Sequence, residues 1–328
     1  MKRSIRVWIW LFLLLLLIID PQTIQSGVRE GIELCLWTLI PTLFPFMILT
    51  TLLAQEMQNF YVPGISRIEH LLQIPQKYFS LFLLGLLGGY PVGAKCICDC
   101  VRDNRLPADD GKRMLCFCSN AGPSFIFGLG MSLFGSLRMC LQIWICQIIS
   151  ALLLAMFIPA THSNALKDFQ TKPITVSQAL KEAIVSMAMV CGWVILFRVF
   201  LCFTNKWILN QISDVASIVV YGILEIANGC ISLQNIKSDM ARFVLFSMFL
   251  GFGGLCVCMQ TQCLAENAGV DSSWYLPAKV LQGLLAGILA LASYYFGWMI
   301  LPIFFIFLLL IQYTLQKITT GIFSSYDV

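Results

Sequence analysis

The sequence predicts an all-α polytopic membrane protein of about eight transmembrane helices plus two re-entrant hairpins in two inverted repeats. Its composition is the first reason: of 328 residues 59% are hydrophobic and 12% are charged, against roughly 25% charged in ordinary soluble domains. The second is a series of apolar runs near the roughly 20 residues that cross a bilayer. The third is an order of elements that occurs twice. We therefore read residues 1–328 as one integral membrane domain.

Composition also excludes several functional classes. The net charge of +4 sits in short clusters between apolar runs, without a basic stripe interleaved with aromatic residues, so we expect no nucleic-acid partner. The chain has only two histidines, which argues against a His-based hydrolase or a zinc protease, and we expect no enzymatic activity and no catalytic residue. Cys96, Cys98 and Cys100 lack the C-x2-C spacing of structural zinc sites. We expect buried thiols, and neither a metal nor a cofactor.

The first elements are an N-terminal helix and a kinked span. Val7–Ile19 is a short apolar run after a basic start, and we predict a retained transmembrane helix within residues 1–26; a cleaved signal peptide is the alternative. Gly31–Leu53 is the next span, and its Pro41 and Pro45 each remove a backbone donor and predict a kink. The mixed polar stretch that follows reads as a cytoplasmic loop or surface helix.

A hairpin and a broken helix come next. Leu81–Leu87 is apolar for barely two turns before a Gly/Pro-rich turn at residues 88–95, which is too short for a full crossing and fits a re-entrant hairpin. The span that ends near Phe134 carries Ser119–Ser124 at mid-depth, which predicts a break. Leu141–Pro159 is a further span.

The second half restates this order. A long span from Lys181 is followed by a short apolar run, Ile218–Asn228, and then by a span broken at Gly251–Gly254. Spans near Trp274–Phe296 and Met299–Leu315 complete the chain. The predicted organisation is an N-terminal helix in 1–26, repeat 1 in 27–160, a cytoplasmic linker in 161–175, repeat 2 in 176–298, and a C-terminal helix and tail in 299–328.

Loop charges predict the orientation. With the N-terminus inside and no net crossing at either hairpin, most of the 21 lysines and arginines fall on the cytoplasmic side, Lys279 among them. The outer side holds only Arg29, Arg138, Lys206, Lys237 and Arg242. The first hairpin then enters from the cytoplasm and the second from outside. Inverted repeats with broken helices indicate a secondary transporter with its site near the midplane.

The predicted site is the polar cavity that irregular backbone in a membrane requires. The half-helices after Gly93 and Gly122 could present N–H groups to an anion, although glycines also permit close helix packing. An ionisable group within a span, such as Glu225, is a functional candidate by default, and a solvated lip position is its alternative. The candidate binding residues are Gly89, Tyr90, Pro91, Gly93, Lys95, Ser119, Asn120, Gly122, Pro123, Ser124, Glu225, Asn228, Gly229, Gly251, Gly253, Gly254 and Gln260.

Three of the polar side chains have open alternatives. Lys95 could attract an anion or simply obey the positive-inside rule, and we favour the second. Gln260 could donate to a solute or to a neighbouring helix. Arg198 lies late in a span and is expected to snorkel outward.

Four motifs resemble those of a known family. They are Gly89–Lys95 (GYPVGAK), Ser119–Phe125 (SNAGPSF), Glu225–Gly229 (EIANG) and Gly251–Gly254 (GFGG). The chain resembles, from about residue 27 to residue 290, the YlbJ-type sporulation integral membrane proteins, which belong with the nucleoside-recognition, or Gate-domain, membrane proteins. The resemblance implies movement of dipicolinate in spore-formers and a distant similarity to concentrative nucleoside transporters with paired hairpins. The chain departs at Ala121 and around Cys256, where relatives look more polar.

We therefore expect a secondary transporter of a small, anionic, ring-bearing solute linked to sporulation. A nucleoside or nucleobase transporter and a non-transporting sporulation assembly factor are the alternatives. The expected partners are the solute, membrane lipid, a coupling proton or sodium ion, and further copies of the chain if it forms a homo-oligomer. The expected location is the bacterial cytoplasmic membrane with both termini cytoplasmic, or the membrane around the forespore.

Overall fold

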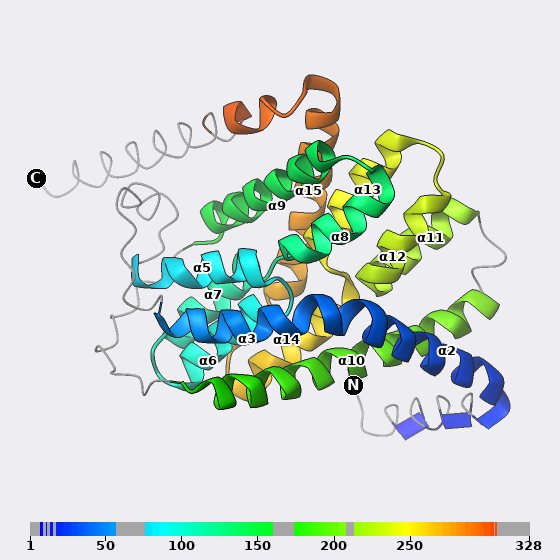
Figure 1. Cartoon of the computed structure of the whole chain (residues 1–328), viewed down its shortest axis with the longest axis horizontal. Helices are drawn as coiled ribbons and strands as arrows, with labels where there is room; N and C mark the ends of the chain where they lie inside the picture. Colours follow the sequence, from blue (N-terminus) through cyan, green and yellow to red (C-terminus); the bar gives the residue numbers. More distant parts are fainter. Residues whose placement is uncertain are drawn as a thin grey trace, which may run out of the picture.

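The computed structural model describes residues 18–56, 76–159, 174–207 and 213–304, with 306 and the isolated positions 7, 8, 11, 14 and 15. These residues form helices joined by short connections, and no strand occurs among them (Figure 1). Six helices, two of them interrupted, are long and apolar enough to cross a membrane. The prediction of an all-α polytopic membrane protein is confirmed. The first predicted span, the polar stretch at 57–75, most of the linker and most of the last span lie outside the described residues.

Large apolar side chains cover the outer faces of these helices. Trp37 is 80% exposed, Val185 65% and Ile288 63%. Water would penalise so much contiguous apolar surface, whereas lipid accepts it. The long helices are therefore built to have one face against the protein and the other against hydrocarbon.

The first described helix is long and irregular, and runs through α2 (Pro21–Leu34), a π turn η1 (Cys35–Leu39) and α3 (Ile40–Glu56). It begins at Pro21, earlier than predicted, because the Asp20 side chain accepts from the Thr23 N–H at 3.3 Å and caps it. The π turn ends two residues before Pro41, which has no N–H to donate. The expected kink region is thus a local change of helix type.

Helix α10 (Val176–Trp207) packs antiparallel against this first helix. Gly27 and Gly31 make the approach close: a Cβ on Gly27 would lie 2.8 Å from Val199 Cα, and one on Gly31 2.9 Å from Ile195 Cα. The two helices that open the repeats therefore form one long pair along an edge of the molecule (Figure 1).

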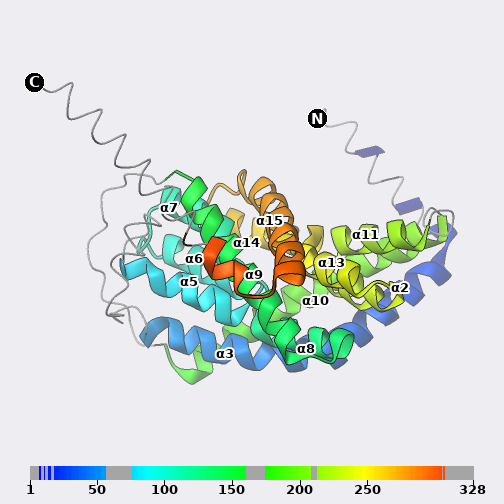
Figure 2. The ribbon, with the colours of Figure 1, turned by 90° about the horizontal axis from the view of Figure 1, so that it is seen from above.

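Two helical hairpins are present. The first consists of α5 (Gln76–Gly88) and α6 (Val92–Arg102), and the second of α11 (Asp214–Leu224) and α12 (Ile226–Ser232), which continues into the 3-10 turn η4 (Leu233–Asn235). They lie toward opposite ends of the long axis (Figures 1 and 2). The tip of the second is Glu225, three residues before the predicted turn, because its carboxylate caps α12. Whether each hairpin enters and leaves on one side of a membrane stays a prediction.

Both predicted breaks are confirmed. Helices α7 (Ala108–Cys118) and α8 (Pro123–Phe134) are separated at residues 119–122, with extended backbone at Ser119 and Gly122. Helices α13 (Asp239–Phe252) and α14 (Gly254–Ala268) are separated at Gly253, whose φ of +83° favours glycine. Helices α9 (Leu137–Phe157) and α15 (Tyr275–Phe296) follow. Kinked or long helix, hairpin, broken helix and helix therefore occur twice in this order.

Candidate functional site

A small cavity lies where the two hairpin tips meet the two helix breaks. About 50 Å³ of it is open to the centres of water-sized molecules, and one water needs about 10–15 Å³ by that measure. It therefore holds a few waters and not a ring-bearing solute. Its lining consists of Leu39, Leu43, Tyr90, Ala121, Gly122, Phe125, Val190, Val194, Glu225, Ile226, Ala227, Cys256, Val257 and Gln260.

Corresponding elements of both halves contribute to this cavity. Four of the predicted binding residues line it: Tyr90, Gly122, Glu225 and Gln260. The walls come from the two opening helices: η1 and α3 supply Leu39 and Leu43, and α10 supplies Val190 and Val194. Both hairpin tips, both opening helices and the first break thus line one cavity, and the second break packs directly behind it, against Tyr90 and Ile226.

Glu225 is a buried carboxylate at the tip of the second hairpin. Only 2% of the residue is exposed, so it is not a solvated lip residue. Its oxygens accept from the Ala227 N–H at 3.0 Å, the Asn228 N–H at 2.8 Å and the Asn228 side-chain amide at 2.7 Å. These donors and the positive end of α12 compensate part of the cost of burying a carboxylate. The α12 N-terminus is therefore occupied by the chain's own acid.

Asn228 connects Glu225 to Arg198. The Arg198 guanidinium donates to the Asn228 side-chain oxygen and forms an ion pair with Glu30 of α2. The expectation that Arg198 snorkels outward is wrong, because these two acceptors hold it between α2 and the second hairpin. A line of polar contacts, Glu30–Arg198–Asn228–Glu225, thus joins the opening helix of one half to the hairpin of the other.

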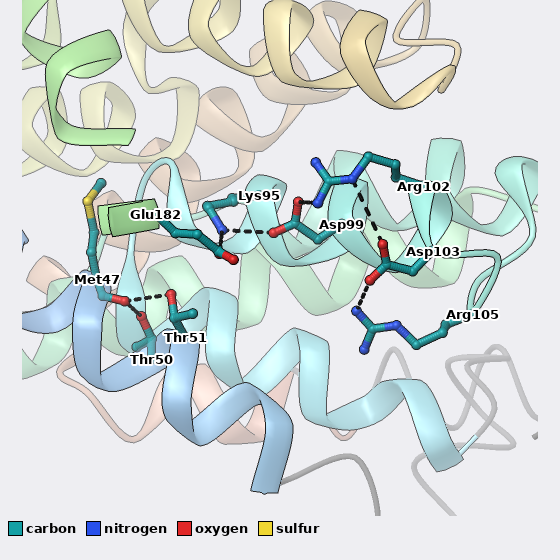
Figure 3. A network of polar contacts seen from close by, with 9 residues as sticks. All are labelled: Met47, Thr50, Thr51, Lys95, Asp99, Arg102, Asp103, Arg105 and Glu182. Carbon is teal, nitrogen blue, oxygen red and sulfur yellow. Dashed lines mark hydrogen bonds and ion pairs between the residues drawn. The ribbon is translucent and has the colours of Figure 1, made fainter. Parts of the chain in front are cut away.

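Lys95 has a different environment on the first hairpin (Figure 3). Its ammonium lies 2.8 Å from Asp99 and 2.7 Å from Glu182 of α10. Because two carboxylates already compensate its charge, Lys95 has little to offer an anionic solute. It ties α6 to α10, as Arg198 ties α12 to α2.

Several predicted glycines serve close packing. A Cβ on Gly93 would lie 2.3 Å from the Cys118 carbonyl oxygen, and one on Gly229 would lie 2.2 Å from Gly222 Cα. Gly251 similarly packs against Gly283 of α15, since a Cβ on Gly251 would lie 2.8 Å from the Gly283 Cα. These contacts favour the close-packing alternative at the three positions.

Other glycines bring the tips and breaks together. A Cβ on Gly89, where φ is +74°, would lie 2.6 Å from the Gly122 nitrogen. One on Gly253 would lie 3.0 Å from the Tyr90 ring, and one on Gly254 would lie 3.1 Å from the Ile226 nitrogen. The second break therefore sits against both hairpin tips.

Ser119 and Asn120 face α15 rather than the cavity. The Asn120 side-chain oxygen accepts a hydrogen bond from the Gln282 side chain at 2.7 Å. The Ser119 hydroxyl accepts one from the Tyr275 hydroxyl at 3.2 Å, and the Ser119 carbonyl accepts one from the Lys279 ammonium at 2.6 Å. Sequence reasoning missed this network, since it counted Lys279 as a loop charge; the residue is 0% exposed. Of the remaining candidates, Pro91 occupies the N-cap position of α6 and Pro123 begins α8. The Ser124 hydroxyl is buried and has no hydrogen-bond partner among the described residues.

Comparison with known proteins gives one relative. The chain is 21% identical over 320 residues to the sporulation integral membrane protein YlbJ of Bacillus subtilis (strain 168), and the similarity covers 83% of this chain and 78% of that protein. No family model matches the chain. No solved structure matches it. The architecture and this similarity agree on a multi-pass integral membrane protein.

Proposed function

We propose that this protein is a secondary transporter of a small, anionic, ring-bearing solute, and that the cavity between the hairpin tips and helix breaks is its binding site. The observation that carries the proposal is that one cavity is lined by corresponding parts of both halves: both hairpin tips, both opening helices, the first helix break, and α14 directly after the second break. Broken helices that meet in the interior are the usual way for a transporter fold to expose backbone groups to a solute.

The small size of the cavity fits an occluded conformation. A transporter alternates access to its site, so one of its states excludes both aqueous sides. Movement of a hairpin would enlarge the cavity. The Lys95–Glu182 ion pair of the first hairpin and the Arg198–Asn228 hydrogen bond of the second are contacts that such a movement would break. Both contacts join a hairpin to α10.

Glu225 has a defined place in this proposal. A carboxylate that lines the cavity would repel an anion, so we propose that Glu225 binds a coupling proton, or accepts a hydrogen bond from a ring nitrogen or hydroxyl on the solute. Asn228 keeps it oriented through its backbone and side-chain N–H groups.

The biological setting follows from similarity alone. Because the relative is a sporulation membrane protein, we propose that this chain acts in a membrane of a spore-forming cell, and that a dicarboxylate such as dipicolinate is the solute to test first. A nucleoside or nucleobase is the second candidate. The lining favours it in one respect: Glu225 and Gln260 are hydrogen-bonding groups, and none of the described residues that line the cavity is cationic.

The test is flux in proteoliposomes that contain the purified full-length protein. Labelled dipicolinate, nucleosides and nucleobases are offered separately, with and without a proton or sodium gradient. The proposal predicts saturable uptake of the dicarboxylate that empty liposomes lack. Uptake of nucleosides alone would favour the second candidate, and no flux of any solute would favour the non-transporting assembly factor.

A matched pair of variants on α10 connects flux to the cavity. Val190 lines the cavity and is 5% exposed, whereas Val185 is 65% exposed on the outer face of the same helix. Val190→Trp should abolish flux by filling the site, and Val185→Trp should retain it. Equal flux in the two variants would contradict the cavity as the route.

A further inference from the structure

Helix α15 carries a buried lysine, Lys279, that is held by neutral groups. Lys279 is 0% exposed and lies one turn after Tyr275, where the helix begins. Among the described residues, no carboxylate forms an ion pair with it within 4.0 Å. Buried lysines are rare unless they are paired, because an isolated ammonium loses its hydration.

Neutral groups hold the ammonium in place. Lys279 Nζ donates to the Ser119 carbonyl at 2.6 Å and to the Gln282 side-chain oxygen at 2.5 Å. The Ser119 carbonyl follows the last residue of α7, where the helix dipole provides only about half a negative charge. An ammonium has three donors, and these two bonds use two of them. The arrangement therefore positions the amine and leaves much of its charge uncompensated.

The cavity ends close to this amine. Lys279 Nζ lies 5.1 Å from the centre of the Tyr90 ring, and Tyr90 also lines the cavity. The extended segment after α7 makes the same connection, because Ser119 contacts Lys279 while Ala121 and Gly122 line the cavity. Only one aromatic side chain and one turn of irregular backbone thus separate the amine from the space where a solute would bind.

We infer that Lys279 is the counter-charge for a carboxylate of the solute, and that the Tyr90 ring covers it in the occluded state. This inference rests on the proposed function and supplies a cationic group, which the described residues of the cavity lining do not include. The ring is buried against the second break, and its hydroxyl makes one hydrogen bond, 3.3 Å long, to the Leu250 carbonyl, so that moving the ring breaks this hydrogen bond and its packing contacts. Rotation of the ring would let a carboxylate replace the ring's weak attraction with a charge-assisted hydrogen bond.

The surrounding side chains suit such a ligand. Tyr275, Gln282 and Asn120 supply neutral donors and acceptors around the amine, and no acid in this network competes with the solute for it. Lys95 is the useful contrast, because its ammonium already has two carboxylates within 3 Å. Of these two lysines, only Lys279 can gain an ion pair when an anion arrives.

The test compares two probes that differ in charge. Binding of pyridine-2,6-dicarboxylate and of its uncharged diamide is measured on the full-length protein in detergent, for the wild type, Lys279→Met and Lys95→Met. We expect Lys279→Met to lose about 30-fold or more in dicarboxylate affinity, as loss of one member of a buried charge pair usually causes, and to keep its affinity for the diamide. Lys95→Met should bind both probes as the wild type does.

Two outcomes separate this inference from the proposed function. If the wild type transports and binds the dicarboxylate and Lys279→Met binds it equally well, the inference is wrong and the transporter proposal stands. If the wild type neither binds nor transports it, both fail.

Tyr90→Leu provides an independent check should Lys279→Met not fold. The smaller side chain uncovers the amine, so the dicarboxylate should associate several-fold faster than with the wild type while the diamide rate stays the same. Equal acceleration of both probes, or of neither, would contradict a role for the amine.

Discussion

The two hairpins share a backbone design and differ in the chemistry of their tips. In both, a pair of glycines lets the arms touch, Gly85 with Gly93 in the first and Gly222 with Gly229 in the second. The first tip presents a neutral aromatic ring, Tyr90, to the cavity, and the second presents a buried acid, Glu225. Glycine packing therefore explains the shared shape, and single side chains explain the difference in function that we propose.

The largest expected difference between the hairpins is the side from which they enter the membrane. The charge pattern predicts that Arg105 lies on the cytoplasmic side and Lys237 outside. Single cysteines are placed at these two positions on a background without native cysteines, and intact cells are treated with an impermeant reagent. The cysteine at 237 should be labelled and the cysteine at 105 should not. Labelling at 105 with none at 237 would overturn the inverted arrangement.

Substitution of glycine by alanine should destabilise both hairpins to a similar extent, because the glycine contacts between the two arms are similar in both. Gly93→Ala and Gly229→Ala place a methyl about 2 Å from backbone atoms, which should cost about 3 kcal/mol or more and leave little monodisperse protein after extraction. Gly128→Ala and Gly192→Ala are matched controls in α8 and α10, since a Cβ there meets nothing within 4 Å. Normal yields for Gly93→Ala would reopen its role as a solute-binding position.

The tip side chains should respond differently. Three N–H groups donate to the Glu225 carboxylate, and in Glu225→Gln at least one of them must face the new amide N–H instead of an oxygen. This should cost about 1–3 kcal/mol of stability. Because the side chain can no longer titrate, transport should become independent of pH or stop. Tyr90→Phe loses one long hydrogen bond, worth about 0.5–1.5 kcal/mol. Thermal unfolding in detergent and flux against pH measure both. An unchanged rate and pH profile in Glu225→Gln would make Glu225 a structural cap only.

The smallest effect is expected at a surface pair far from the tips. The Lys112 ammonium, with help from Ser273, lowers the pKa of Asp271 to about 2 from 3.8 in the loop after α14. A depressed folded-state pKa stabilises the fold above the usual pKa, and this contribution is lost as pH falls through about 2. Asp271→Asn should therefore melt slightly below the wild type at pH 7, with a gap that closes below pH 4. A gap that widens on acidification would contradict the sign.

The sequence predicted the helix breaks, because these depend on backbone conformation and on the residues that favour it. Gly253 and the Ser119–Gly122 segment interrupt apolar runs, and helix breaks lie at both places. Contacts made only by the fold could not be predicted in the same way. From the sequence alone Gly93 looks like a solute-binding glycine, but the fold packs it against the Cys118 carbonyl. Arg198 likewise looks like a snorkelling residue, but the fold gives it a hydrogen bond to Asn228.

Lys279 shows where a stronger signal existed. It lies near the start of a predicted span, which suggested a loop charge. Tyr275, Lys279 and Gln282, however, are spaced i, i+4 and i+7, and so form one polar stripe on an otherwise apolar helix. A charge within such a stripe indicates an interior position.

The central claim is that the cavity between the hairpin tips opens to water and takes up the solute, and a native thiol can report this. Cys256 lines the cavity, whereas Cys258, two residues further along α14, is equally buried but lies outside the lining. Single-cysteine proteins that retain one or the other are treated in proteoliposomes with a small aqueous thiol reagent, with and without the dicarboxylate. The account predicts that Cys256 reacts, that the solute protects it, and that Cys258 stays unreactive. Two inert thiols, or reaction of Cys256 that the solute does not slow, would contradict it.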